Sequence, residues 1–320
     1  MAPYWSGDWG NPSSRQHRLG LTASAAVNLA RRQIANALAV TPQQLVFTSG
    51  ATEANNLALL GHARARGSGH LISVATEHHA VLDPLQQLQR EGFSVSLLTP
   101  GPDGLITPEQ LKQAITPETQ LVSVMAANNE IGVLQPLMAL AAVCSDHGVT
   151  LHSDAAQAFG HIPLEPDALG VDLMSLSAHK LYGPKGVGAL VIRDGIALQP
   201  LQWGGAQEAG LRAGTLPTAL IVGFAAAVQL AMQDREQRQQ RLALLRDQLW
   251  ADLQRKIPDV RLNGALATRL AHNLNITLPG VSGSRLQRAL KPQLSCSSGP
   301  ACSNGAPSHV PQALGRARAG

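Results

Sequence analysis

Short apolar runs alternate with longer segments of helical periodicity along the first two thirds of the chain. The apolar runs have the length of buried strands, whereas the segments between them repeat apolar residues at helical spacing. Strands are predicted at 44–48, 70–75, 94–98, 121–125, 149–153, 172–176 and 187–192, and helices at 23–38, 49–60, 80–90, 108–115 and 137–146. This alternation predicts an α/β fold, in which a mainly parallel sheet is covered by helices on both faces.

The pattern changes after about residue 219. A long helical stretch rich in arginine and glutamine is predicted at 219–256, followed by a strand at 273–278 and a helix at 284–290. A chain of 320 residues, of which 44% are hydrophobic, can bury enough apolar surface for two domains. We therefore predict a large domain over residues 1–233 and a smaller C-terminal α+β domain over residues 234–320.

Composition narrows the classes of protein to which the chain can belong. The net charge of +4 is a scattered excess of arginine and aromatic residues make up only 3%, which argues against nucleic-acid binding. No apolar run is long enough to span a membrane, and the N-terminal residues do not have the pattern of a secretory signal. The odd number of cysteines (Cys144, Cys296 and Cys302) indicates reduced thiols and a cytoplasmic protein.

Lys180 follows a predicted buried strand and precedes a glycine-rich turn. A lysine in such a place is costly unless it is paired, neutralised or used covalently. Lysine is also rare in this chain, and a Schiff base is the one role that the more abundant arginine cannot take over. Lys180 is therefore a candidate Schiff-base lysine, and the alternative is an ordinary lysine in the turn of a β-hairpin.

Asp154 is the candidate partner for a heterocycle. It follows the predicted strand at 149–153, and open parallel sheets bind ligands in the loops after their strands. A carboxylate there can keep a pyridine nitrogen protonated and so make the ring an electron sink. If a helix starts at Asp154, Gln157 lies one turn later and can donate to a ring oxygen. The alternative for Asp154 is a helix N-cap.

Three more strand ends carry candidate residues. The backbone of Ala51 and the hydroxyl of Thr52 can hold a phosphate at a helix start, and His78 can stack on a ring or move protons. Asn129 lies at another strand end. The alternatives are a capped helix, a capped turn and an Asx turn, respectively. Five strand-end loops that all offer partners for a phosphate, a ring and an imine are difficult to attribute to chance.

Five motifs together resemble a known family. They are TSGATEANN at 48–56, TEHHAVL at 76–82, NNEIG at 128–132, DAAQ at 154–157 and SAHKLYGPKG at 177–186. The chain resembles the pyridoxal-phosphate (PLP)-dependent cysteine desulfurases of the NifS/IscS type, from Gly10 to about Gly315. These enzymes belong to the class V aminotransferase group and have the PLP fold type I architecture.

The resemblance implies a role for each candidate residue. Lys180 is implied to hold PLP as a Schiff base, His78 to stack on the ring and act as acid or base, and Asp154 to pair with the ring nitrogen. Gln157 and Asn129 are implied near the phenolic oxygen. The other implied contacts are those to the phosphate, from Ala51, Thr52, Ser177 and His179, and from Thr215 of the second subunit of a homodimer. Thr215 can also be a helix N-cap.

Cys302 lies in a segment of small and turn-forming residues, which predicts a mobile surface loop. The resemblance implies that it takes the sulfur of L-cysteine as a persulfide, leaving alanine, and passes it to an acceptor such as an iron–sulfur scaffold protein. Cys144 is predicted to lie in the core and Cys296 at a strand end. Two neighbouring cysteines without other clustered ligands make a poor metal site, so no metal site is predicted.

Two alternatives accompany this assignment, a selenocysteine or cysteine lyase and a truncated, non-catalytic PLP-fold dimer partner. Residues 1–9 are not expected to match the family pattern. Family members continue beyond the cysteine loop with an arginine that binds the substrate carboxylate, and neither Arg316 nor Arg318 matches that motif. We therefore expect an incomplete small domain.

Overall fold

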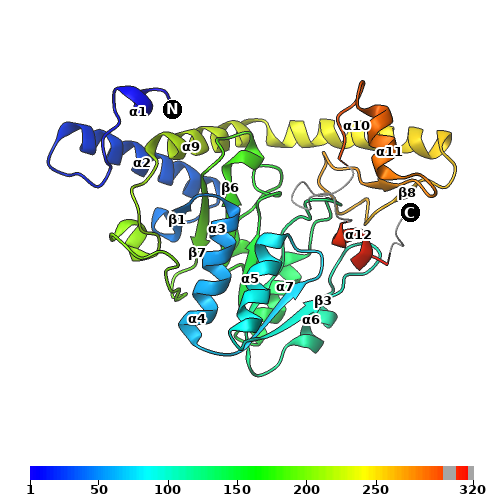
Figure 1. The fold of residues 1–320 in the computed structure, drawn as a ribbon, viewed down its shortest axis with the longest axis horizontal. Helices are drawn as coiled ribbons and strands as arrows, with labels where there is room; N and C mark the ends of the chain where they lie inside the picture. Colours follow the sequence, from blue (N-terminus) through cyan, green and yellow to red (C-terminus); the bar gives the residue numbers. More distant parts are fainter. Residues whose placement is uncertain (298–307, 316–320) are drawn as a thin grey trace.

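The computed structural model describes residues 1–297 and 308–315 of the chain (Figure 1). A seven-stranded sheet lies at its centre, with the strand order β1-β7-β6-β5-β4-β2-β3. The strands are β1 (Leu45–Thr48), β2 (His70–Val74), β3 (Ser94–Leu98), β4 (Thr119–Ser123), β5 (Thr150–Asp154), β6 (Leu173–Ser177) and β7 (Gly188–Ile192). The adjacent strands β3, β2, β4, β5 and β6 pair in parallel, in that order across the sheet. Strand β7 is antiparallel to both β1 and β6. The prediction of a mainly parallel sheet is confirmed.

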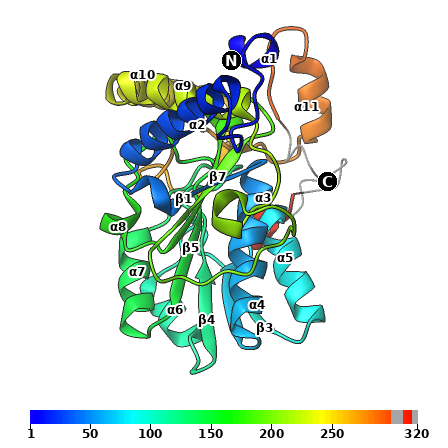
Figure 2. The same cartoon turned by 90° about the vertical axis from the view of Figure 1, so that its left-hand side faces the viewer.

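Helices cover both faces of this sheet, as predicted (Figure 2). One face packs against α2 (Arg18–Ala37), α6 (Pro108–Ala114), α7 (Leu137–Asp146) and α9 (Thr218–Gln233), and the other against α3 (Ala51–Asn56) and α5 (His79–Arg90). Successive strand residues point to opposite faces, so Ile72 joins the first core and Leu71 the second. Shorter helices are α1 (Pro3–Ser6), α4 (His62–Arg66) and α8 (Pro166–Leu169). A single π-helical turn, Leu57–Gly61, joins α3 to α4.

The long helix predicted at 219–256 is two helices, α9 and α10 (Arg235–Lys256), which meet at Asp234. The apolar α9 packs against α2 (Figure 1). In α10, Trp250 is the buried residue. The strand predicted at 273–278 is shorter than expected, because only β9 (Ile276–Thr277) pairs with β8 (Arg261–Leu262). Two more helices follow, α11 (Gly283–Leu290) and α12 (His309–Ala313). In the described part of the chain, every helix is too short or too polar to cross a bilayer.

Phe224 tests the packing of α9 against the sheet. Its side chain is fully buried and meets the ring of Phe159 edge-on, with 6.4 Å between centroids. Replacing it with alanine removes that contact and leaves a cavity, so Phe224→Ala is expected to lower the free energy of unfolding by about 3–5 kcal/mol in urea titrations. Leu249→Ala, at a position of α10 that is 51% exposed, is the control and should stay within about 0.5 kcal/mol of the parent. Equal effects of the two substitutions would contradict the packing described.

Candidate active site

The loops after β2, β4 and β5 meet at the carboxyl edge of the sheet. Ala126 N–H donates to the carbonyl oxygen of Asp154 at 2.9 Å, which joins the segment after β4 to the end of β5. The Asn128 side chain donates to the carbonyl oxygen of Thr76 at 2.9 Å, which joins the same segment to the loop after β2. Three of the predicted strand-end segments are therefore held side by side, because parallel strands end at one edge of a sheet.

Asp154 is the last residue of β5 and is buried, with 8% of its surface exposed. Its Oδ1 accepts a hydrogen bond from Ala156 N–H at 2.9 Å, and its Oδ2 accepts one from Asn55 Nδ2 at 2.7 Å. Burial raises the pKa of the carboxyl, and these two donors and the charges of His78 and Lys180 oppose that rise. The helix N-cap alternative is wrong, because a turn and no helix follows Asp154, and Gln157 lies half-buried in that turn.

Lys180 lies in a 3₁₀ turn, Ala178–Leu181, directly after β6. Its surroundings match the hairpin alternative in one respect, because β6 and β7 form an antiparallel pair around it. Lys180 is exposed, and its charge acts on both His78 and Asp154. Beside it, Ser177 and His179 share a hydrogen bond of 2.7 Å between Oγ and Nδ1. The amine is therefore available at the same edge as the buried carboxylate.

The start of α3 lies next to the end of β6. Gly188 of β7 pairs with Thr48 on one side and with Ser177 on the other. A Cβ atom at Gly188 would lie 2.7 Å from the Cα of Gly50, so only glycine allows this close approach. Ala51 is half-buried and Thr52 is exposed at the helix start, on the loop that Gly188 holds against β6.

His78 caps α5, as the structural alternative expected. Its Nδ1 accepts a hydrogen bond from Ala80 N–H at 3.0 Å. Burial lowers the pKa of the imidazole, and the charge of Asp154 opposes this shift. Because Nδ1 accepts this bond, the hydrogen of the neutral ring lies on Nε2, which can donate to a group in the same cluster of loops. The capping role therefore leaves a chemical role open.

The Asx turn expected at Asn129 is formed by its neighbour instead. Asn128 Oδ1 accepts from the N–H groups of Glu130 and Ile131, both at 2.9 Å. Asn129 is half-buried, and its Oδ1 is a buried oxygen with no hydrogen-bond partner within the described residues. A buried oxygen without a partner is costly, which makes this side chain a candidate ligand group.

The C-terminal part of the chain holds this loop in place. Asn273 Nδ2 and Asn275 Nδ2 donate to the carbonyl oxygen of Glu130 at 2.9 and 3.1 Å. Gly132 has a φ of +70°, and a Cβ atom there would lie 2.4 Å from the Cγ of Asn273. These two asparagines were not predicted as part of the site. Their only signal in the sequence is the Asn-x-Asn spacing beside an apolar strand, which does not indicate a partner 143 or 145 residues away.

Two other residues of the site were also missed. Asn55 contacts Asp154, although the motif at 48–56 that contains it was recognised. Glu77 is fully buried, and its Oε1 accepts a hydrogen bond from Met125 N–H at 2.6 Å. Burial raises the pKa of Glu77 well above its ordinary value, and the nearby charge of Asp154 adds to this rise. Glutamate is rarely fully buried, so its residue type gave no reason to expect Glu77 inside the site.

Several predicted residues lie elsewhere. Thr215 is exposed and lines a small pocket with Trp5 and Trp9, and the N-cap alternative is wrong because Pro217 precedes α9. Cys302 lies outside the described residues. Cys144 is buried, which raises the pKa of its thiol to about 12 and makes it a poor nucleophile. Cys296 is exposed in a segment without a strand, so its assignment to a strand end is wrong.

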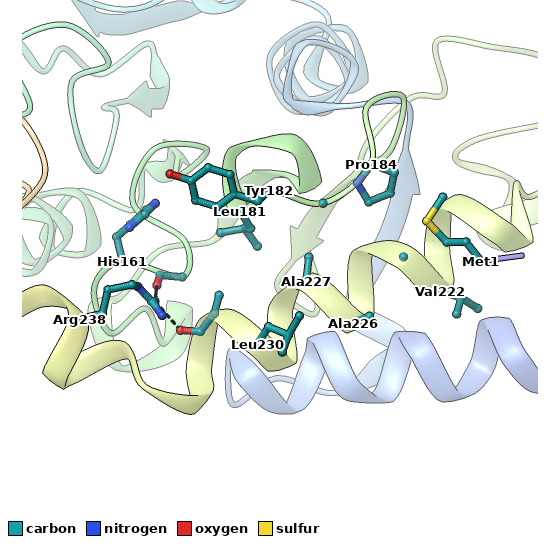
Figure 3. Close-up of a pocket in the computed structure, with 14 residues that line it drawn as sticks. Met1, His161, Leu181, Tyr182, Pro184, Val222, Ala226, Ala227, Leu230 and Arg238 are labelled. Atoms are coloured by element: carbon teal, nitrogen blue, oxygen red, sulfur yellow. Dashed lines mark hydrogen bonds between the residues drawn. The ribbon is translucent and has the colours of Figure 1, made fainter. Parts of the chain in front are cut away.

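A separate, apolar pocket of about 600 Å³ lies beside α9 (Figure 3). Leu181, Tyr182 and Pro184 line one side, and Val222 and Leu230 of α9 line the other. Tyr182 is 96% exposed and Leu230 is 68% exposed. The pocket therefore adjoins the turn of Lys180 and presents apolar side chains to the surface.

The residues at the sheet edge fit PLP. A buried carboxylate suits a protonated pyridine nitrogen, an exposed amine suits the aldehyde, and the buried Oδ1 of Asn129 lacks a protein partner in the described part of the chain. Hydroxyl and backbone donors at Thr52 and Ser177 suit a phosphate. The charges of Lys180 and Asp154 both act on His78, which places the three groups within electrostatic reach of one another.

Comparisons with known proteins agree with this set of groups. The family model described as aminotransferase class-V matches residues 1–319. The chain therefore belongs to the class-V aminotransferase family. Within that family it is similar to the cysteine desulfurase IscS of Aeromonas hydrophila, with 46% identity over 315 residues, which cover 97% of this chain and 78% of the relative.

Solved structures show the same relationship. A NifS-like protein superposes with a TM-score of 0.92 and 34% identity, over 99% of this chain and 85% of its own. The protein described as SspA in complex with cysteine superposes with a TM-score of 0.84 and 36% identity, over 99% of this chain and 90% of its own. The fold is the PLP fold type I, and the chain is a member of the cysteine desulfurase group of the NifS/IscS type.

Glu77 gives the protein a predictable dependence of stability on pH. Because its folded pKa lies above the ordinary value of 4.5, folding must take up a proton at any pH between the two values. As the pH rises across that window, the free energy of unfolding falls by up to about 1.4 kcal/mol per pH unit. Glu77→Gln carries no such penalty, so it should be more stable than the parent at pH 7 and lose this advantage toward pH 4.

Urea titrations at a series of pH values measure this difference. Glu236→Gln, at an exposed position of α10, is the control and should track the parent at each pH. A Glu77→Gln protein whose stability differs from the parent by the same amount at pH 4 and pH 7 would show that the pKa of Glu77 is not raised in the folded protein.

Proposed function

We propose that this chain is a PLP-dependent cysteine desulfurase that converts L-cysteine to L-alanine and passes the sulfur to Cys302. The observation that carries the proposal is the meeting of Lys180, Asp154 and His78 at one sheet edge, in a chain 46% identical to a cysteine desulfurase. A solved relative that is described as holding cysteine supports L-cysteine as the substrate.

Bound PLP would supply an electron sink for the electrons released at the substrate Cα. Asp154 would face the ring nitrogen, and its two hydrogen-bond donors keep the carboxylate oriented there. The Lys180 amine would move the proton at the substrate Cα. Ala51, Thr52, Ser177 and His179 would hold the phosphate, and Gln157 and Asn129 the phenolic oxygen.

Sulfur transfer needs a thiolate and a proton acceptor. The C–S bond of L-cysteine breaks as Cys302 Sγ bonds to the substrate sulfur, and the carbon keeps the electron pair and takes up a proton to give alanine. A free thiol has a pKa of about 8.5, so Cys302 needs a proton acceptor, and His78 would serve by taking the proton on Nδ1 in place of its bond from Ala80 N–H. Cys144 cannot take this part, because it is buried and its thiol pKa is about 12.

A homodimer is part of the proposal. The apolar pocket beside α9, which Tyr182 lines, provides surface that a second copy would bury (Figure 3). The exposed Trp5 and Trp9 add to this surface. Thr215 would then reach the phosphate site of the other subunit. The proposed acceptor is an iron–sulfur scaffold or another sulfur-accepting protein, and the proposed location is the cytoplasm, where thiols stay reduced.

Lys180→Ala tests the role of the lysine. The variant should lose the absorbance band of covalently bound PLP and lower alanine formation from L-cysteine by about 10²-fold or more, because it loses both the attachment point and the proton carrier. Alanine is quantified after incubation with PLP, L-cysteine and a reductant. Lys185→Ala, at an exposed position five residues later, is the matched control and should keep both properties. Normal turnover by Lys180→Ala would end the proposal.

Cys302→Ser separates a desulfurase from a lyase. A serine cannot form a persulfide, so the variant should bind PLP normally but lose alanine formation by about 10²-fold. Mass spectrometry should find an added sulfur on Cys302 of the parent after L-cysteine is supplied. Cys296→Ser is the control. Sulfide release that persists in Cys302→Ser would favour a cysteine or selenocysteine lyase, and a parent that binds PLP without turnover would favour a non-catalytic dimer partner.

A further inference from the structure

Asn55 lies at a buried position of α3 that faces the catalytic carboxylate. Its surface is fully buried, and its Nδ2 donates to Oδ2 of Asp154 at 2.7 Å. Its Oδ1 is also buried and has no hydrogen-bond partner among the described residues. The next residue, Asn56, differs, because its Nδ2 donates to the carbonyl oxygen of Thr52 in the preceding turn of the same helix. Only Asn55 therefore reaches across to β5.

We propose that Asn55 is a positioning residue, which holds the Asp154 carboxylate ionised and directed at the pyridine nitrogen of PLP. The inference rests on the proposed function, since it concerns how the same site holds its cofactor. The amide acts through Asp154, because its Nδ2 donates to that carboxylate. Because Asn55 is one helical turn after Ala51, the helix that begins at the phosphate end of the site also orients the ring partner.

The chemistry of the pair explains why an amide is needed. A hydrogen bond to the ionised form of an acid favours that form, and Asn55 provides one without bringing a charge. An arginine or lysine would offer the carboxylate a competing cation in place of the pyridinium. An aspartate would bring a second negative charge to Oδ2. An aliphatic side chain would fill the space but leave Oδ2 without its donor.

A second buried acid, Glu77, makes the hydrogen bond from Asn55 important, because it helps to decide which of the two carboxyl groups is ionised. Asp154 lies close enough for its charge to act on Glu77, and two buried carboxyl groups do not ionise together easily. Asp154 accepts two hydrogen bonds, from Ala156 and Asn55, whereas Glu77 accepts one, from Met125. The buried Oε2 of Glu77 has no partner among the described residues. The extra donor therefore places the negative charge on Asp154 and leaves Glu77 protonated.

The orientation of the Asn55 amide follows from the same contacts. A carboxylate accepts hydrogen bonds but donates none, so Nδ2 and not Oδ1 must face Asp154. The Oδ1 atom is then left buried without a partner in the described part of the chain, which is a cost that the bond to Asp154 offsets. Side chains that serve packing alone do not retain such an arrangement, because leucine would occupy a similar volume without this cost.

The test compares Asn55→Leu with the parent in the PLP-loaded protein. The isosteric leucine removes the donor, so Asp154 holds the ring nitrogen protonated less well, and the Lys180 imine then keeps its own proton to higher pH. In a pH titration followed by the absorbance of bound PLP, the midpoint should shift to higher pH. The kcat for alanine formation should fall by about 10- to 100-fold with little change in KM. Asn36→Leu, at an exposed position of α2, is the matched control.

Asn55→Asp provides a second, independent readout. An aspartic acid at this position can donate to Asp154 only while it is protonated, so its kcat relative to the parent should rise as the pH is lowered. This comparison decides the question even if Asn55→Leu does not fold. A ratio that stays constant with pH, or an Asn55→Leu protein with an unchanged absorbance midpoint and kcat, would overturn the proposal.

The proposed function and this inference can fail separately. If the parent binds PLP but forms no alanine, the desulfurase assignment fails, while the absorbance midpoint still reports on Asn55. If the parent is active and both Asn55 variants match it, the assignment stands and Asn55 is a packing residue.

Discussion

A carboxylate buried at the end of β5 is the constraint on which the site depends. Removing a charged group from water is costly unless hydrogen bonds or opposite charges compensate for the loss. Asp154 obtains this compensation from three elements, since Asn55 of α3 and the backbone of Ala156 donate to it and Lys180 follows β6. The charge can persist only while these elements stay together, and the geometry of the site is therefore coupled to the fold of the sheet.

The interior behind Asp154 is polar but carries little charge. His152 precedes it by two residues on the same face of β5, and its ring is held between Ser123 of β4 and Ser175 of β6 at 2.8 and 3.0 Å. Burial lowers the pKa of His152 to about 3, so the ring is neutral at physiological pH. Neutral hydrogen bonds thus tie the three central strands together without offering Asp154 a competing cation. The pyridinium is the partner that the proposed function assigns to this carboxylate.

Much of the fold could be predicted from the sequence, because its central strands are short apolar runs that leave little choice of structure. The helix at 137–146 and the strand at 94–98 have the predicted bounds. The prediction of a single long C-terminal helix failed, because one continuous helical periodicity covered a buried segment and an exposed segment. The periodicity predicts one helix over 219–256, but the chain breaks at Asp234 between an apolar helix packed on α2 and a largely exposed one. The short β8–β9 pair likewise depends on tertiary contacts rather than on β-propensity.

The sequence by itself determined which residues could carry the chemistry, because Lys180, His78, Asp154 and Cys302 stand in motifs whose residue types suit PLP and sulfur transfer. Only the tertiary structure decided which neutral side chains support them. Asn55, Asn273 and Asn275 act through contacts across the fold, and an asparagine that orients a carboxylate or a loop has no local pattern that differs from a surface asparagine. The physical reason is that a hydrogen bond depends on where the partner lies in space, whereas periodicity and spacing report only on neighbours along the chain.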